Sequence, residues 1–123
     1  MTPPSLYSRI GGEGGVEELV VGFYSRVLED PTLARFFMNL DTPRLIRKQI
    51  AFITFAFGGV TGYSGLKLRE AHRGAAGRGM TDAHFDAVVG HFRAALEEKG
   101  VGEAEIAEAL AIVESVRSEV LCR

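Results

Sequence analysis

Residues 44–57, RLIRKQIAFITFAF, decide the fold, because their apolar side chains recur with the period of an amphipathic helix. At about 3.6 residues per turn, one narrow stripe of this helix carries Leu45, Gln49, Phe52 and Ala56. The Gln49 side chain is therefore directed toward the interior of the protein, where apolar side chains normally lie. A buried amide without a partner costs roughly 1–3 kcal/mol, so the stripe must meet either water or another polar group at its middle.

Helical patterns precede this stretch. The first predicted helix begins near Glu13 and ends before Pro31, and one of its faces carries Val16, Leu19, Val20, Phe23, Tyr24 and Val27. Pro31 then opens a short helical turn that includes LARFF. Asp41 is the expected N-cap of the glutamine-containing helix, with Thr42 and Pro43 in its first turn. We expect that helix to end at Gly58-Gly59.

A glycine-rich segment from Gly58 to Gly79 follows, in which only a short piece around LKLREAH has a helical pattern. Helical periodicity resumes at Thr81 and continues to Lys99-Gly100, with Phe85, Val88, Val89, Phe92 and Leu96 on one stripe. A last helix is predicted from about Gly102, burying Ile106, Leu110, Val113, Val116 and Val120. The fold class is therefore all-α.

Length and composition set further bounds. The 123 residues are expected to form one domain (1–123), with the 46% hydrophobic and 24% charged residues of an ordinary globular protein. No apolar run is long enough for a membrane span, and the start, MTPPSLYSRIGG, lacks the pattern of a signal peptide, so we expect a cytoplasmic protein. The single cysteine, Cys122, excludes an internal disulfide.

The charges are unevenly distributed. The net charge of −2 gives no general reason to expect nucleic acid as a partner. However, the segment from Thr42 to Thr81 contains seven basic residues and one acid, Glu70. Two interpretations stay open from this pattern alone: a solvated basic face, or a site near an anionic ligand.

Polar residues on inner helix faces favour a ligand site. All-α chains of this size include simple bundles, repressor-like modules and cofactor holders. A bundle core is built from aliphatic residues without amides or phenols. Here Tyr24 and Gln49 both lie on inner faces, opposite a glycine-rich segment that contains His72.

The histidines narrow the choice of ligand. His84 and His91 are seven residues apart, about 10.5 Å of helical rise, too far to share one metal ion, and we expect both at the surface or its boundary. His72 ends the piece GLKLREAH, with no second ligand at zinc spacing and no Ser/His/Asp or Cys/His arrangement. One histidine is sufficient for haem, because the porphyrin supplies the four in-plane ligands.

The chain resembles the truncated (two-on-two) haemoglobin family, group I. The matching stretches are LYSRIGGEGGVEELV, FYSRVLEDPTLARFF, RLIRKQIAFITFAFGG, YSGLKLREAH and TDAHFDAVVGHF, and the resemblance runs from Leu6 to Val120. It implies a shortened globin fold, a two-on-two helical sandwich around haem b (iron protoporphyrin IX). The pairs Gly11-Gly12 and Gly58-Gly59 match sharp corners of that fold.

The resemblance also implies roles for individual residues. His72 becomes the proximal iron ligand, and Tyr24 and Gln49 the distal pair that contacts a bound gas. Leu45 takes the position where ordinary globins have a distal histidine. The haem contacts implied are Phe37, Leu45, Lys48, Phe52, Tyr63, Leu68, Arg69, Met80, Phe85 and Val88, with Lys48, Tyr63 and Arg69 near the propionates.

These roles imply a protein that binds O₂ reversibly and tightly, because hydrogen-bond donors in a dry pocket stabilise the partial negative charge of the bound gas. Some members of the family oxidise nitric oxide to nitrate. The expected partners are O₂, NO, CO and an unidentified reductase, and we expect a monomer or weak dimer. Two alternatives stay open: a haem-based sensor or redox protein with Lys48 as sixth ligand, and a cofactor-free helical module with Tyr24 and Gln49 bonded to each other.

Overall fold

The computed structural model describes residues 4–37, 40–58 and 79–121, and these residues form helices and turns with no strand among them. The helices are α1 (Leu6–Arg9), α2 (Gly12–Glu29), α3 (Pro31–Ala34), α4 (Thr42–Ala56), α6 (Asp82–Glu98), α7 (Glu103–Glu114) and α8 (Arg117–Val120), with a 3₁₀ turn at Arg35–Phe37. The all-α prediction is confirmed.

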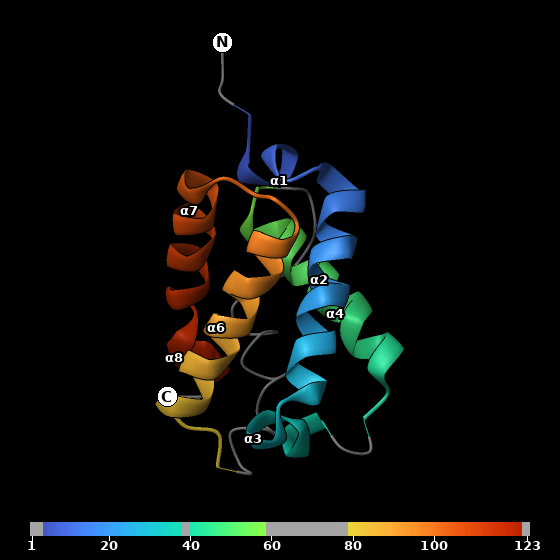
Figure 1. The fold of residues 1–123 in the computed structure, drawn as a ribbon, viewed down its shortest axis with the longest axis vertical. Coiled ribbons are helices and arrows are strands. Elements are labelled where there is room, and N and C mark those ends of the chain that lie inside the picture. The colour runs from blue at the N-terminus through green and yellow to red at the C-terminus, as the bar shows by residue number, and fades with distance from the viewer. Residues whose placement is uncertain (1–3, 38–39, 59–78, 122–123) are drawn as a thin grey trace.

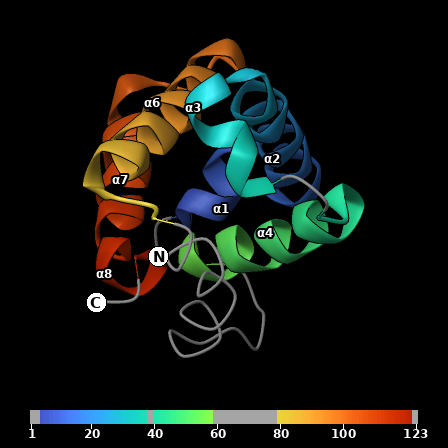
Figure 2. The same ribbon diagram turned by 90° about the horizontal axis from the view of Figure 1, so that it is seen from below.

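Four helices form two packed pairs. Helix α2 packs against α4 and also against α6, and α6 packs against α7. Figure 1 shows α4 and α7 on opposite sides of the molecule, with α2 and α6 between them. Figure 2, the view from below, shows the same separation of the α2 and α4 pair from the α6 and α7 pair. This is the predicted two-on-two arrangement.

Local capping signals place the helix ends that the sequence predicts. The Asp41 carboxylate accepts a hydrogen bond from the backbone N–H of Arg44 at 3.1 Å and so caps α4. At α6 the backbone N–H of Thr81 donates to His84 Nδ1 at 3.0 Å, as part of a capping box. Asp30 caps α3 by accepting from the backbone N–H of Thr32 at 2.9 Å.

Glycines form the corner between α1 and α2. Gly11 and Gly12 have φ angles of 110° and 64°, in the left-handed region that side chains disfavour. A Cβ atom at Gly15 would lie 2.1 Å from the carbonyl oxygen of Ile10, so only glycine allows the backbone of the corner to approach α2 this closely. Gly58, just after α4, has a φ of 96°. The sharp corners predicted at Gly11-Gly12 and at Gly58 are present, and Gly59 lies outside the described residues.

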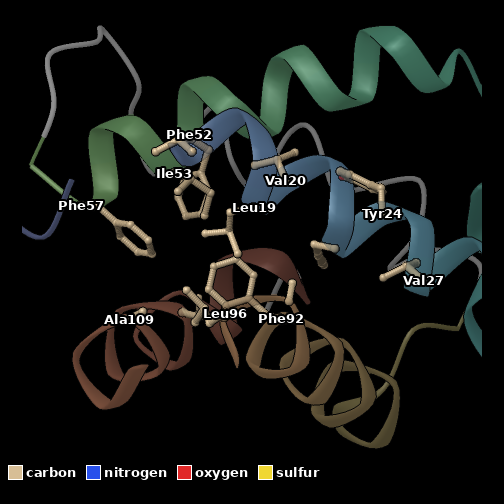
Figure 3. Packing of buried hydrophobic residues seen from close by; sticks show 14 of the residues in the cluster. Leu19, Val20, Tyr24, Val27, Phe52, Ile53, Phe57, Phe92, Leu96 and Ala109 are labelled. Atoms are coloured by element: carbon tan, nitrogen blue, oxygen red, sulfur yellow. The ribbon is translucent and has the colours of Figure 1, made fainter. Parts of the chain in front are cut away.

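The core lies where the two helix pairs meet. Figure 3 shows Leu19 of α2, Ile53 of α4 and Phe92 of α6 turned toward one another at the centre of the packed side chains. All three are almost completely buried. The rings of Phe23 and Phe92 meet edge to face, with their centroids 5.5 Å apart, a geometry that adds to the free energy gained by burial.

The C-terminal helix differs from the prediction. Instead of one helix from Gly102 to Val120, α7 ends at Glu114 and α8 begins at Arg117. At the break the Ser115 hydroxyl donates to the carbonyl oxygen of Ile112 at 2.6 Å. A serine hydroxyl that competes for backbone acceptors in this way weakens the regular helical pattern.

Arg117 fastens α8 to the first turns of α6. Its guanidinium donates to Glu114 and Asp86 at 2.6 Å each and to Asp82 at 3.1 Å. These hydrogen bonds, led by that to Glu114, raise the pKa of Arg117 above its already high value. The same guanidinium lies 4.7 Å from the centre of the Phe85 ring, a cation–π contact. The C-terminal segment is thereby held against the part of α6 that carries Phe85.

None of the described helices combines the length and the apolar character required to span a lipid bilayer.

Candidate functional site

A pocket that is partly continuous with solvent opens between the two helix pairs. The lining consists of Phe23, Tyr24, Phe37, Gln49, Phe52, Ile53, Met80, Phe85, Val88, Phe92, Val113, Val116 and Val120. Only two of these side chains, those of Tyr24 and Gln49, carry hydrogen-bonding nitrogen or oxygen groups.

Aromatic neighbours hold the Tyr24 ring in place. The ring is 7% exposed and lies edge to face with Phe37, with the centroids 5.8 Å apart, and tilted against Phe23 at 5.2 Å. Figure 3 shows the Tyr24 side chain extending from α2 on the side that faces α4. Burial on α2 and contacts on two sides therefore fix the phenol at the pocket wall.

Gln49 reaches the same pocket from α4. It is half-buried, and Phe52 and Ile53, one turn further along the helix, line the pocket beside it. The amide thus occupies the wall of a cavity and not the packed core. The stripe quoted from the sequence faces a space that a second polar side chain, Tyr24, also borders.

The structure brings together most of the predicted haem contacts that it describes. Tyr24, Gln49, Phe37, Phe52, Met80, Phe85 and Val88 all line the pocket. Leu45 is half-buried against the core and does not belong to the lining. Lys48 is exposed on α4, also outside the lining. His72, Tyr63, Leu68 and Arg69 lie outside the described residues.

Sequence reasoning did not assign several apolar residues to the pocket. These are Phe23, Ile53, Phe92, Val113, Val116 and Val120. Their helical spacing marks them as inward-facing, and nothing in that pattern separates a side chain that borders a cavity from one that fills the core. They extend the apolar wall on both helix pairs, with Phe23 on α2 and Ile53 on α4, and the other four on α6 and the C-terminal segment.

The two described histidines have structural roles at the boundary, as predicted. His84 completes the cap of α6, and its ring lies edge to face with Phe36 at 5.0 Å. His91 Nε2 lies 2.7 Å from the Asp30 carboxylate. The hydrogen bond from His91, followed by those from Thr32, lowers the pKa of Asp30 to about 2.

Comparison with known proteins identifies the family. The model of the bacterial-like globin family matches residues 5–122. The chain is 41% identical over 119 residues to the group 1 truncated hemoglobin LI410 of Chlamydomonas moewusii, which covers 97% of this chain and 69% of that protein. It is also 41% identical over 109 residues to the group 1 truncated hemoglobin of Synechocystis sp., which covers 88% of each chain.

A solved structure agrees in fold as well as in sequence. The 2/2 hemoglobin of Synechococcus sp. PCC 7002, a crystal structure in the cyanomet state with covalently attached heme, superimposes with a TM-score of 0.91 at 37% identity. The match covers 98% of this chain and 100% of that one. Shared sequence, shared helical arrangement and the pocket between the helix pairs lead to one conclusion: the chain belongs to the bacterial-like globin family, as a group 1 truncated hemoglobin.

Proposed function

We propose that this chain holds haem b in the pocket between the helix pairs, with His72 as the iron ligand, binds O₂ there through Tyr24 and Gln49, and uses it to oxidise nitric oxide to nitrate. Membership of the globin family and the heme attached in the Synechococcus relative support the choice of cofactor.

The described residues fit a haem. Phe37, Phe52 and Phe85 give the pocket aromatic walls, and Met80 and Val88 add flexible and aliphatic surface. Such a lining suits the flat, apolar porphyrin better than a charged ligand. The haem propionates require cations at the rim of the pocket, and Lys48 follows directly before Gln49 on α4.

The observation that carries the proposal is the presence of Tyr24 and Gln49 on an otherwise apolar wall. A haem bound here would supply an iron to which a diatomic gas binds with partial negative charge on the gas. The Tyr24 hydroxyl can donate a hydrogen bond to that charge, and the Gln49 amide can both donate and accept. The apolar side chains around Tyr24 and Gln49 lower the local polarity, which strengthens these hydrogen bonds.

Oxidation of nitric oxide requires that the pocket keeps O₂ until a second gas molecule arrives. Donation from Tyr24 slows the release of O₂, and the wall that NO meets in the pocket is apolar apart from Tyr24 and Gln49. The overall conversion of NO, O₂ and one electron to one nitrate ion is balanced. Each turnover therefore requires one electron from outside this chain.

Two measurements on the purified protein test the proposal. An absorption spectrum with a Soret band that is absent from His72→Ala supports haem binding through His72. Mixing the O₂-loaded protein with NO should yield one nitrate per haem, and Tyr24→Phe should lower the yield because O₂ escapes first. A wild-type protein without a Soret band, or nitrate formation indifferent to Tyr24, would contradict the respective half of the proposal.

The alternative of a sensor or redox protein with Lys48 as sixth ligand has no contact to support it, because the Lys48 side chain is exposed and outside the pocket lining. An amine must lose its proton before it can bind iron, and the pocket lining offers no contact that would bring Lys48 to that site. A ferric spectrum that stays high-spin from neutral to mildly alkaline pH, and is unchanged in Lys48→Ala, would exclude this alternative.

A further inference from the structure

Helix α4 has a second face that the pocket does not use. At about 100° per residue, this face carries Arg44, Arg47, Ala51 and Phe55, and we call it the α4 stripe. Both arginines are exposed, and the Phe55 ring is 46% exposed at the C-terminal end of the helix. Gln49 lies on the opposite side of the helix and lines the pocket.

The charge of the α4 stripe is not compensated within the described part of the chain. Neither Arg44 nor Arg47 forms an ion pair with another described residue. Helix α4 contains no acid, and the carboxylate of Asp41 before it is engaged in capping. By contrast, Arg26 pairs with Glu98 and Arg93 pairs with Glu103.

Helix α7 lies on the side of the molecule opposite α4 (Figures 1 and 2). Its four glutamates are all in ion pairs: Glu105 and Glu108 with Arg9, Glu103 with Arg93 and Glu114 with Arg117. The arginines of the α4 stripe, which no described acid pairs with, are therefore a local excess of positive charge on a chain whose net charge is −2, and this excess attracts an acidic partner to the α4 side.

We propose that the α4 stripe is the docking surface for an acidic one-electron donor protein. The proposal rests on the proposed function, because oxidation of NO to nitrate consumes one electron per turnover. Since one face of α4 lines the pocket, a partner on the α4 stripe is separated from the pocket by this one helix, whose diameter is roughly 10–12 Å.

The size of the stripe favours a transient protein partner over other polyanions. Electron-transfer encounters use small interfaces and depend on charge for their rate of association. Binding to duplex nucleic acid gains its affinity from many Lys and Arg contacts to phosphates, and the α4 stripe offers two arginines. A helix that lies in a membrane surface needs a broad exposed apolar face, whereas the α4 stripe offers Phe55 alone.

The test measures reduction of the ferric holoprotein by a reduced, acidic [2Fe–2S] ferredoxin in stopped flow, at increasing ionic strength. The variant is Arg44→Gln/Arg47→Gln. The matched control is Arg26→Gln/Arg93→Gln, which removes the same charge from paired arginines elsewhere. At low ionic strength we expect the rate constant to fall about tenfold in the variant and less than about twofold in the control.

Two further measurements separate docking of the ferredoxin from other effects of the substitutions. Reduction by dithionite should be equal in all three proteins, because a small reductant needs no docking surface. Phe55→Ser should raise the ferredoxin concentration that gives half of the maximal reduction rate, because it removes contact area. It should leave the dependence of the rate on ionic strength unchanged, because it removes no charge.

Equal ferredoxin rates in the wild type, the variant and the control would overturn the proposal. The proposal would also be overturned, in favour of a membrane surface, by two results together. The wild type would bind phosphatidylglycerol vesicles and the arginine variant would not, while the ferredoxin rates of both proteins stayed equal. O₂ release and nitrate yield are measured separately on the same proteins. A failure of docking is thus distinguishable from a failure of the proposed gas chemistry.

Discussion

The substitution Tyr24→Phe isolates the hydrogen bond that the proposed function requires. The Tyr24 ring is buried and packs on Phe37 and Phe23, and a phenylalanine ring can keep both contacts. The change therefore removes a hydroxyl and leaves the shape of the pocket wall nearly intact. Any effect on ligand release then reports on the donor and not on the packing.

The expected size of the effect follows from the environment of the hydroxyl. A hydrogen bond to a partly charged acceptor in a dry site contributes about 1.5–3 kcal/mol. At roughly 1.4 kcal/mol per factor of ten, the O₂ dissociation rate should rise about tenfold to a hundredfold. The association rate should change much less, because it depends on entry into the pocket. Gln49→Leu should act in the same direction.

Stopped-flow release of O₂ and of CO from the same proteins checks this prediction. Carbon monoxide carries far less charge on its outer atom, so its release should accelerate only slightly. Tyr7→Phe is the matched control: Tyr7 is half-buried in α1 and does not line the pocket, so both rates should stay as in the wild type. Equal acceleration of O₂ and CO release in Tyr24→Phe would show that Tyr24 acts through size alone and would refute the electrostatic reasoning.

His72→Ala should abolish stable haem incorporation, whereas His84→Ala should keep the Soret band and lose only the stability that its α6 cap provides. Gly15→Ala should lower the free energy of unfolding by more than about 1 kcal/mol, because its Cβ would overlap the Ile10 carbonyl, while Gly14→Ala, with open space around it, should be neutral or stabilising in urea titrations. The pKa of Asp30 is lowered to about 2 in the folded state, so its stabilising effect is complete above about pH 4 and is lost toward pH 2. Asp30→Asn should therefore flatten the acid dependence of unfolding in that range, and an unchanged slope would contradict the role of the carboxylate.

Local signals were sufficient to predict the helices that build the pocket. The ends of α4 follow from the Asp41 cap and from Gly58, each of which acts within a few residues. Its two faces follow from helical periodicity, which directs Gln49 inward and Arg44 outward. These properties depend on residues that are close together in the sequence, so they can be predicted without the tertiary structure.

The break between α7 and α8 depends on contacts that the sequence does not display. Val113, Val116 and Val120 keep helical spacing across the break, so periodicity alone predicts one continuous helix. The segment is redirected by the Ser115 hydroxyl and by Arg117, which pairs with acids of α6 more than thirty residues earlier. A distant partner of this kind becomes visible only after the helices have packed.

The site also combines features that the local sequence predicts with features that only the packing of the helices decides. The sequence by itself identified Tyr24 and Gln49 as unusual, because a phenol and an amide stand at positions where helical periodicity expects apolar side chains. Only the tertiary structure decided that the two border one pocket, that Leu45 and Lys48 lie outside its lining, and that Phe23 and Phe92 belong to it. The physical reason is that a cavity is the space that packed helices fail to fill. Its outline is set by the mutual fit of several helices, whereas the inward or outward direction of a side chain is set by one helix alone.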